Sequence, residues 1–303
     1  MKRTIIIISL LAAACSGLQA QTLSLKDDAA IDTVGTSMFT AVYLYEIQTQ
    51  DARGNAVTDS ILLALQVGDG LSKCFAYDRY LKEKGELQNI NDCAFFEALM
   101  HVQSVWSGYP AEQRRTLETI APYCYEVTEK RQQPKWALTE ETDSVCGYSC
   151  RGASGEFRGK TWNVLYAEEI PSPAGPWKLE GLPGLIAKAE DAEHHHRFTL
   201  IGITQEAMPI TYPKYYSLFS YDNGGASKKA VPYMKRKLSK MIAFKQRTFG
   251  SKTYPSNPNA YMPDLMTAFG SVSTVYGQTQ DVTVVNGTVI LGEGHVYQPL
   301  ELK

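Results

Sequence analysis

The sequence predicts a mainly β fold, in which one strongly curved antiparallel sheet or open barrel carries one or two packed helices. From residue 37 onward, apolar and polar residues alternate with the period of two that is typical of strands. Short turns rich in Gly, Pro and Asn separate these stretches, and helical spacing is seen in only a few places. Because there is neither an internal repeat nor a recognisable linker, we expect a single β-rich domain over residues 21–303.

The first strands form the clearest part of the prediction. Residues 39–47 carry aromatic and aliphatic side chains on both faces, as a central strand does. Residues 61–67 alternate cleanly, and Gly68-Asp69-Gly70 offers a tight turn into residues 72–78. The sheet is therefore expected to begin as a meander.

Later strands are expected where the same period returns. They lie near residues 123–128, 136–138, 144–150, 157–166, 185–189 and 197–204. Two short strands, 282–285 and 288–291, are predicted to pair across Asn286-Gly287, the strongest hairpin signal in the chain.

Three stretches have helical spacing. Residues 92–106 repeat apolar side chains every three or four positions and stop at Gly108-Tyr109-Pro110, and a second helix is expected from Ala111 to about Ile120. Residues 228–247 are basic and compatible with a helix whose apolar stripe comprises Val231, Met234, Leu238, Met241 and Ile242. Such a helix sometimes lies on a membrane, but more often it packs on a core with a solvated charged face.

The first twenty residues are predicted to be a signal peptide. Lys2-Arg3 precede a short apolar core, and small residues favour cleavage between Ala20 and Gln21. Ala12-Ala13-Ala14-Cys15 is a loose lipoprotein box, so a rival cut would leave Cys15 lipidated. Both readings predict an exported protein, in the periplasm or associated with the outer membrane.

Composition limits the partners and the compartment. The chain has 30 Lys and Arg against 32 Asp and Glu, and losing Lys2 and Arg3 makes it more acidic, which argues against a nucleic-acid partner. After the leader, no apolar run approaches the length of a transmembrane helix, so we expect no integral helical membrane protein.

Five cysteines remain after cleavage, namely Cys74, Cys93, Cys124, Cys146 and Cys150. Export permits disulfides, and an odd count leaves at least one thiol outside them. We take Cys124 with Cys146 or Cys150 as the first pairing to test. The alternative is that several are small buried apolar residues.

No stretch carries a strong catalytic, metal or cofactor signature, and we expect none of the three. Residues 154–161 nearly match a phosphate-binding loop, but Ser154 stands where Gly is needed and a strand-like segment follows Lys160. His194-His195-His196 beside Asp191 and Glu193 offers metal-ligand types, yet adjacent residues of a strand point to opposite faces.

One turn motif stands out, Gly181-Leu182-Pro183-Gly184-Leu185-Ile186. Leu-Pro-Gly-Leu suits a type II turn with Pro183 at its second position and Gly184, at positive φ, at its third. Leu185 and Ile186 then begin a buried strand. The aromatic and proline-rich stretch from Trp162 to Leu179 is expected to be a packed loop over the open side of the sheet, with an apolar groove as the alternative.

Residues 169–186 read Glu-Ile-Pro-Ser-Pro-Ala-Gly-Pro-Trp-Lys-Leu-Glu-Gly-Leu-Pro-Gly-Leu-Ile. This run resembles the signature of the GLPGLI family, and Gln298-Pro299-Leu300-Glu301-Leu302 is similar to the family's C-terminal end. The resemblance implies a protein exported by Gram-negative bacteria of the Bacteroidetes group, in a family without an established enzymatic activity. It also leads us to expect an outer-membrane receptor nearby.

Together these observations predict a non-catalytic cell-envelope protein, accessory to outer-membrane transport or assembly. It would bind an apolar ligand or a protein partner such as an outer-membrane receptor. Two alternatives remain open at this point: a thiol-dependent enzyme built around Cys150, and an integral outer-membrane barrel.

Overall fold

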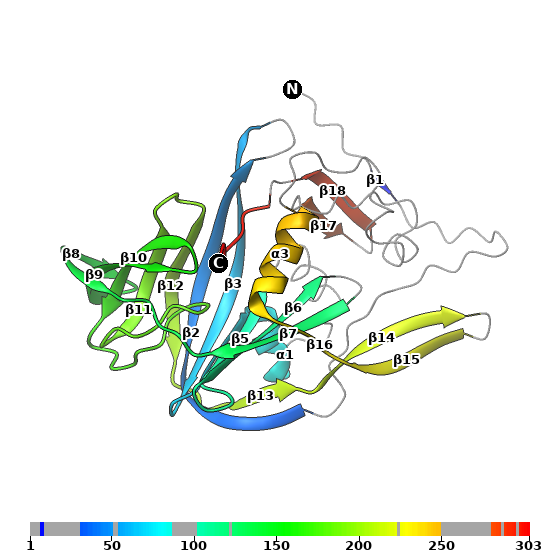
Figure 1. The fold of residues 1–303 in the computed structure, drawn as a ribbon, viewed down its shortest axis with the longest axis horizontal. Coiled ribbons are helices and arrows are strands. Elements are labelled where there is room, and N and C mark those ends of the chain that lie inside the picture. The colour runs from blue at the N-terminus through cyan, green and yellow to red at the C-terminus, as the bar shows by residue number, and fades with distance from the viewer. Residues whose placement is uncertain are drawn as a thin grey trace.

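Strand β2 (Ile31–Gln50) organises the molecule, whose computed structural model is shown in Figure 1. On one side β2 pairs along most of its length with β3 (Ala56–Gly68). On the other side its second half pairs with β12 (His196–Thr204) and its first half with β13 (Pro209–Pro213). The structure describes residues 7–8, 31–50, 54–86, 102–120, 123–222, 225–249, 280–285, 288–294 and 297–303.

The main sheet has thirteen strands. Its order is β16-β7-β6-β5-β4-β3-β2-β12-β11-β10-β9-β8, with β13 beside β2. The other strands are β4 (Ser72–Ala76), β5 (Gln103–Ser107), β6 (Gln113–Ile120), β7 (Tyr123–Lys130), β8 (Ala137–Val145), β9 (Tyr148–Phe157), β10 (Lys160–Ala167), β11 (Leu185–Asp191) and β16 (Met234–Arg236). Neighbours are antiparallel except β16 and β7, which are parallel.

The predicted fold class is confirmed as a curved sheet with few helices. The sheet bends around β2 and β3 and does not close into a barrel, because β16 and β8 remain separate edges (Figure 1). Two smaller sheets complete the described part, a hairpin of β14 (Tyr215–Asp222) with β15 (Gly225–Pro232), and β1 (Ile7–Ile8) with β18 (Thr288–Gly294) and β17 (Gln280–Val285). The hairpin predicted across Asn286-Gly287 is therefore confirmed by the pairing of β17 with β18.

In the described part of the chain, two helices pack on the sheet. α1 (Tyr77–Glu83) follows β4 directly, and its Tyr80 is buried against Ala64 and Phe75. The sequence analysis missed this short helix, because it expected a strand to continue to residue 78. α3 (Leu238–Phe249) lies against β7, where the rings of Phe244 and Tyr125 are 5.7 Å apart.

Two of the predicted helices are wrong where the structure describes them. Residues 113–120 form strand β6, and residues 103–107, the end of the stretch predicted at 92–106, form β5; residues 92–101 lie outside the described part. β6 turns Arg114, Thr116 and Glu118 into the protein, where all three are buried. A strand whose inward face is polar shows no apolar alternation, so its period is hidden from a hydropathy reading.

The third predicted helix is correct only in its second half. Residues 225–236 form β15 and β16, and the helix begins at Leu238 rather than near residue 228. Met241 and Ile242 are buried, as the proposed apolar stripe requires. Val231 lies on β15 and Met234 on β16, so neither belongs to the helix.

Candidate functional site

The segment that carries the motif fills the inside of the curved sheet. Residues 168–184 connect β10 to β11 without regular structure, yet every residue from Ala174 to Glu180 is buried. The Trp177 ring lies 5.8 Å from that of Trp162 and 5.9 Å from that of Phe157. Its indole Nε1–H donates to Gln103 Oε1 at 2.9 Å, which ties the segment to β5. From residue 168 onward the stretch is therefore a packed loop, as expected, whereas Trp162 and Tyr166 lie on strand β10.

The predicted turn geometry is wrong at Gly184. Within the motif the positive φ belongs to Gly181, at 102°, and Gly184 is not among the glycines with positive φ. Gly184 is required for a different reason: a Cβ placed on it would lie 2.1 Å from the Ala167 carbonyl oxygen and 2.8 Å from Glu168 Cα. Leu185 and Ile186 are fully buried and begin β11, as predicted.

A buried carboxylate anchors the end of the loop. Glu180 Oε1 accepts a hydrogen bond from Arg114 Nη2 at 2.7 Å, and Glu180 also accepts two bonds from Arg131 at Nε and Nη2. Arg114 is fully buried and additionally donates to the Lys178 carbonyl oxygen at 3.2 Å. Burial lowers the pKa of Arg114, and the charge of Glu180 offsets part of this effect.

A second carboxylate ties the loop to the C-terminal residues. Lys178 Nζ donates to Glu301 Oε1 at 2.8 Å and to Glu129 Oε1 at 3.1 Å. Arg158 pairs with the other oxygen of Glu129. Burial acts to raise the pKa of Glu301, but the charges of Lys178 and Lys245 outweigh it and hold this pKa below its usual value.

Hydrogen bonds and an ion pair connect these buried charges to helix α3. Gln103 donates to both Glu118 and Glu301, and Lys245 of α3 donates to both oxygens of Glu118 at 3.0–3.1 Å. We call this set the buried ion network. Its charged members are Arg114, Glu118, Glu129, Arg131, Arg158, Lys178, Glu180, Lys245 and Glu301.

The buried ion network has a structural role, because it links distant segments of the chain. Each of its carboxylates bonds at least one cation, and it joins β6, β7, the β9–β10 turn, the loop, α3 and the C-terminal residues. Sequence reasoning missed it. The one available signal was the run of polar residues at alternate positions of β6.

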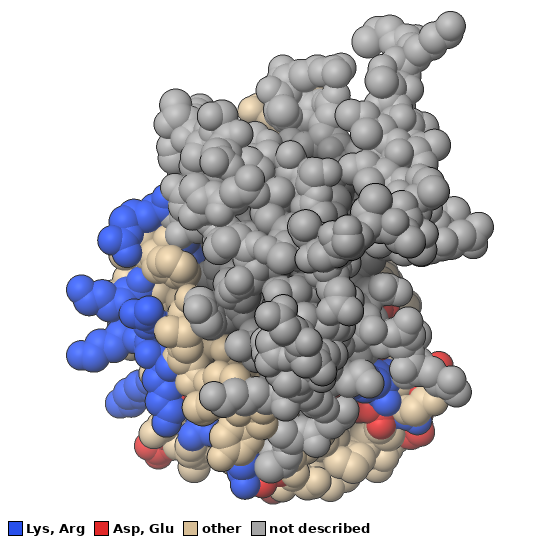
Figure 2. Space-filling model, turned by 90° about the vertical axis from the view of Figure 1, so that its right-hand side faces the viewer, with Lys and Arg blue, Asp and Glu red and all other residues tan. Residues whose placement is uncertain are grey.

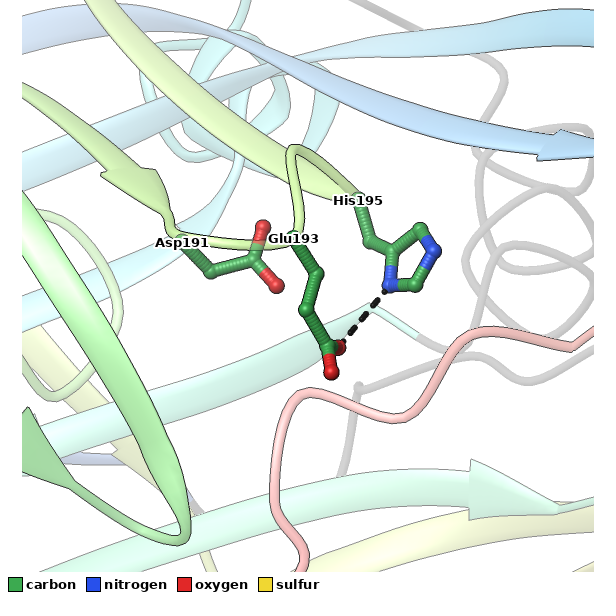
Figure 3. A group of neighbouring side chains, drawn as sticks. All are labelled: Asp191, Glu193 and His195. Atoms are coloured by element: carbon green, nitrogen blue, oxygen red, sulfur yellow. Dashed lines mark ion pairs between the residues drawn. The ribbon is translucent and has the colours of Figure 1, made fainter.

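The histidine-rich turn between β11 and β12 brings metal-ligand types together without forming a metal site. Figure 3 shows Asp191, Glu193 and His195, whose ligand atoms lie within 4.8 Å of one another. Lys160 already supplies the cation here, because its Nζ lies 2.7 Å from Asp191 Oδ2 and 3.3 Å from Glu193 Oε2. We therefore assign no metal to these residues.

The three histidines of the turn face different partners. His194 bonds Glu190, and His195 pairs with Glu193. His196 is fully buried: its Nε2–H donates to the Pro299 carbonyl oxygen at 3.2 Å, and its Nδ1 accepts from the Tyr45 hydroxyl at 2.9 Å. Because a carbonyl can only accept, this arrangement places the proton of the neutral imidazole on Nε2. Burial, aided by the charge of Lys160, lowers the pKa of His196 to about 3.

Acid should therefore destabilise the fold through His196. The pKa of His196 rises to about 6.5 on unfolding. The stability that the buried neutral ring contributes to the fold is therefore complete above about pH 6.5 and is lost as the pH falls toward about 3. Between pH 7 and pH 5 we expect the free energy of unfolding to fall by about 2 kcal/mol through this group. Urea unfolding at the two pH values should show this loss in the wild type and not in His196→Gln. His194→Gln, on the exposed part of the turn, is the control and should behave as the wild type; an equal loss in all three would contradict the assignment.

The suggested disulfide between Cys124 and Cys150 is not formed. Cys124 lies on β7 and Cys150 on β9, and eight other strands stand between these two in the sheet order. Cys124 and Cys146 are not bridged to each other either. Cys150 is buried and its Sγ–H donates to the Tyr148 carbonyl oxygen at 3.4 Å. Burial raises the pKa of Cys150, a setting typical of an unreactive thiol.

Two hollows in the described part of the molecule bear on ligand binding. A cavity of about 60 Å³ lies between β4–β7, α1 and β13, lined by aromatic residues and by the ion pair of Lys73 with Glu83. An open groove of about 430 Å³ runs along β8 and β9 beside the start of the loop. Its lining is polar and consists of Thr142, Asp143, Ser149, Cys150, Arg151, Glu168 and Glu169.

Several predicted features lie outside the described residues. These include the signal cleavage between Ala20 and Gln21, Cys15 and Cys93. Within the described part, no helix is both long enough and apolar enough to cross a membrane.

Comparison with known proteins gives little beyond this geometry. No family model matches the chain, and no curated protein is similar to it. Among solved structures, PNGF-II in a P21 crystal form is similar over 69% of this chain at 11% identity and a TM-score of 0.41. PNGF-II in a C2 form is similar over 69% of this chain at 13% identity and a TM-score of 0.38. The chain matches 33% and 34% of these two proteins, about a third of their length.

Proposed function

We propose that this chain is an exported, non-catalytic protein of the bacterial cell envelope that binds a protein partner, as the GLPGLI resemblance implies. The partner class we favour is an outer-membrane receptor or an assembly component beside it. The observation that supports this most is strand β8, which forms a free edge of the main sheet and is exposed at every position from Ala137 to Ser144.

The geometry favours a protein partner over an apolar ligand. The loop of residues 168–184 fills the inside of the curved sheet, and the buried ion network holds this loop in place. The cavity between β4–β7, α1 and β13, about 60 Å³, is far smaller than the roughly 300 Å³ at which small-molecule pockets begin. The buried thiol of Cys150, with its raised pKa, does not support the alternative of a thiol-dependent enzyme.

Strand β8 is suited to pairing with an added strand. An edge strand offers unpaired backbone N–H and C=O groups, and partners that add a strand use them for affinity. Val145 and Tyr148 flank a two-residue turn and therefore form a hydrogen-bonded pair of the antiparallel ladder. Because hydrogen-bonded and non-hydrogen-bonded pairs alternate along such a ladder, Asp143 and Cys150 form the next hydrogen-bonded pair. The backbone groups of Thr142 therefore point away from β9, toward the free edge and beside the groove.

A photo-crosslinking side chain on β8 should find the partner. We expect one discrete adduct when the probe replaces Leu138, which is 60% exposed on β8, in the envelope of the native host. Ile201, 48% exposed on β12 within the sheet, is the matched control and should give none. Mass spectrometry then identifies the partner, which can be purified for binding measurements.

The partner's affinity should depend on the backbone of Thr142. Thr142→Pro removes one outward N–H without removing a β8–β9 hydrogen bond, because proline is tolerated on the open side of an edge strand. We expect it to weaken binding at least about tenfold, the value of one backbone hydrogen bond lost in a buried contact. Thr142→Val keeps the N–H and should bind as the wild type. Unchanged binding by Thr142→Pro would show that the partner does not pair with β8.

A further inference from the structure

A second surface lies at the opposite edge of the sheet from β8. Strand β16 and helix α3 expose five cations within thirteen residues, namely Lys235, Arg236, Lys237, Lys240 and Arg247. We call these five residues the basic edge. In Figure 2, Lys and Arg side chains gather along one side of the molecule, with hardly an Asp or Glu among them.

The cations of the basic edge are not neutralised by neighbouring carboxylates. Within the part of the chain that the structure describes, none of the five forms an ion pair. The nearby glutamates of β6 and β7 are engaged elsewhere: Glu118 with Lys245, Glu126 with Tyr212, and Glu129 with Lys178. These three side chains are at most 10% exposed, so they do not cancel the outward field.

The orientation of the basic edge is held by packing. Met241 and Ile242 are buried under α3, and the bond from Lys245 to Glu118 holds the same inner face. Burial acts to lower the pKa of Lys245, but Glu118, Tyr297 and Glu301 together outweigh it and favour the charged form. Among residues 238–247 of α3, those left outside are polar, basic or small: Ser239, Lys240, Ala243, Gln246 and Arg247. Over these residues the exposed face therefore offers positive charge rather than large apolar side chains.

We propose that the basic edge docks on a membrane surface rich in anionic phospholipids. An array of exposed cations without ion pairs complements a lipid surface that carries many phosphate charges, and each cation near such a surface contributes roughly a fivefold gain in affinity. The contact is electrostatic, so salt screens it. This proposal is independent of partner binding at β8, which lies at the other edge of the sheet.

Vesicle co-sedimentation of the mature chain, residues 21–303, tests the proposal. We expect binding to phosphatidylcholine vesicles that contain about one third phosphatidylglycerol, little binding to pure phosphatidylcholine, and release as salt is raised from about 0.05 to 0.5 M. The variant with Lys235→Gln, Arg236→Gln and Lys237→Gln should bind roughly a hundredfold more weakly.

The control removes the same charge from elsewhere. Lys135→Gln, Arg151→Gln and Lys303→Gln together change three exposed cations away from the basic edge and should leave vesicle binding within about twofold of the wild type. Thermal melting of both triple variants should match the wild type, because all six positions are exposed. Three outcomes would each overturn the proposal: the control variant weakens vesicle binding as much as the basic-edge variant, the protein binds neutral vesicles as well as anionic ones, or it binds polyglutamate but not anionic vesicles. The last outcome would indicate an acidic protein as the partner instead.

Discussion

Replacing Glu180 by alanine is expected to lower the free energy of unfolding by about 3–5 kcal/mol, the usual cost of removing one partner from a buried ion pair. The carboxylate bonds two guanidinium groups, those of Arg114 and Arg131. Arg114 is fully buried, so without Glu180 its charge stays inside the protein with only neutral oxygens as partners. Equilibrium unfolding in urea, monitored by tryptophan fluorescence, measures the loss.

Two further variants separate this effect from a general loss of charge. Glu140→Ala removes a carboxylate from the exposed strand β8 and should change stability by less than about 0.5 kcal/mol. Glu180→Leu combined with Arg114→Met replaces the pair by apolar side chains and should recover part of the stability lost in Glu180→Ala. If Glu180→Ala unfolds at the wild-type urea concentration, the buried ion network does not hold the loop in place.

The second large effect is expected at Gly184. Gly184→Val should destabilise the protein by more than about 3 kcal/mol, at or beyond the upper end for overpacked sites. Any Cβ at this position meets the backbone of Ala167 and Glu168, which cannot rotate away as a side chain can. Gly184→Ala should therefore already show most of the loss, which distinguishes a steric cause from β-branching. The melting temperature of both variants is the measurement.

Gly202 on β12 provides the matched control. It lies on a strand and, like Gly184, has no positive φ, but nothing lies within 4 Å of a Cβ placed there. Gly202→Ala should leave stability unchanged or raise it slightly, because alanine restricts the unfolded chain. A Gly184→Val protein that kept its melting temperature and lost only partner binding would show that the motif serves recognition rather than the fold.

These two predictions bear on what the motif is for. Pro183 is exposed, Gly181 supplies the positive φ, Gly184 permits close approach, and Leu185 and Ile186 begin a core strand. Glu180, just before the motif, and Glu301, near the C-terminus, bond the cations that hold the loop. The residues that carry the GLPGLI resemblance are thus explained by the fold, and the binding surfaces proposed above lie elsewhere, at β8 and at the basic edge.

Strands with an apolar inward face could be predicted from the sequence, and polar ones could not. β2, β3 and β11 place aliphatic and aromatic residues where the period of two requires them, so their positions were expected correctly. β6 places Arg114, Thr116 and Glu118 inward, and the same rule predicted a helix there. The inward cations and carboxylates are stable only because residues distant in sequence, such as Lys178 and Lys245, come to meet them.

The sequence by itself determined the fold class and the buried strand that begins at Leu185. Local alternation, turn chemistry and composition carry that information, because each acts over a few residues. Only the tertiary structure decided why Gly184 is needed, which charges are buried, and that Lys160 stands among Asp191 and Glu193. These depend on contacts between segments up to 198 residues apart, as in the bond from Gln103 to Glu301, and no local pattern encodes such a distance.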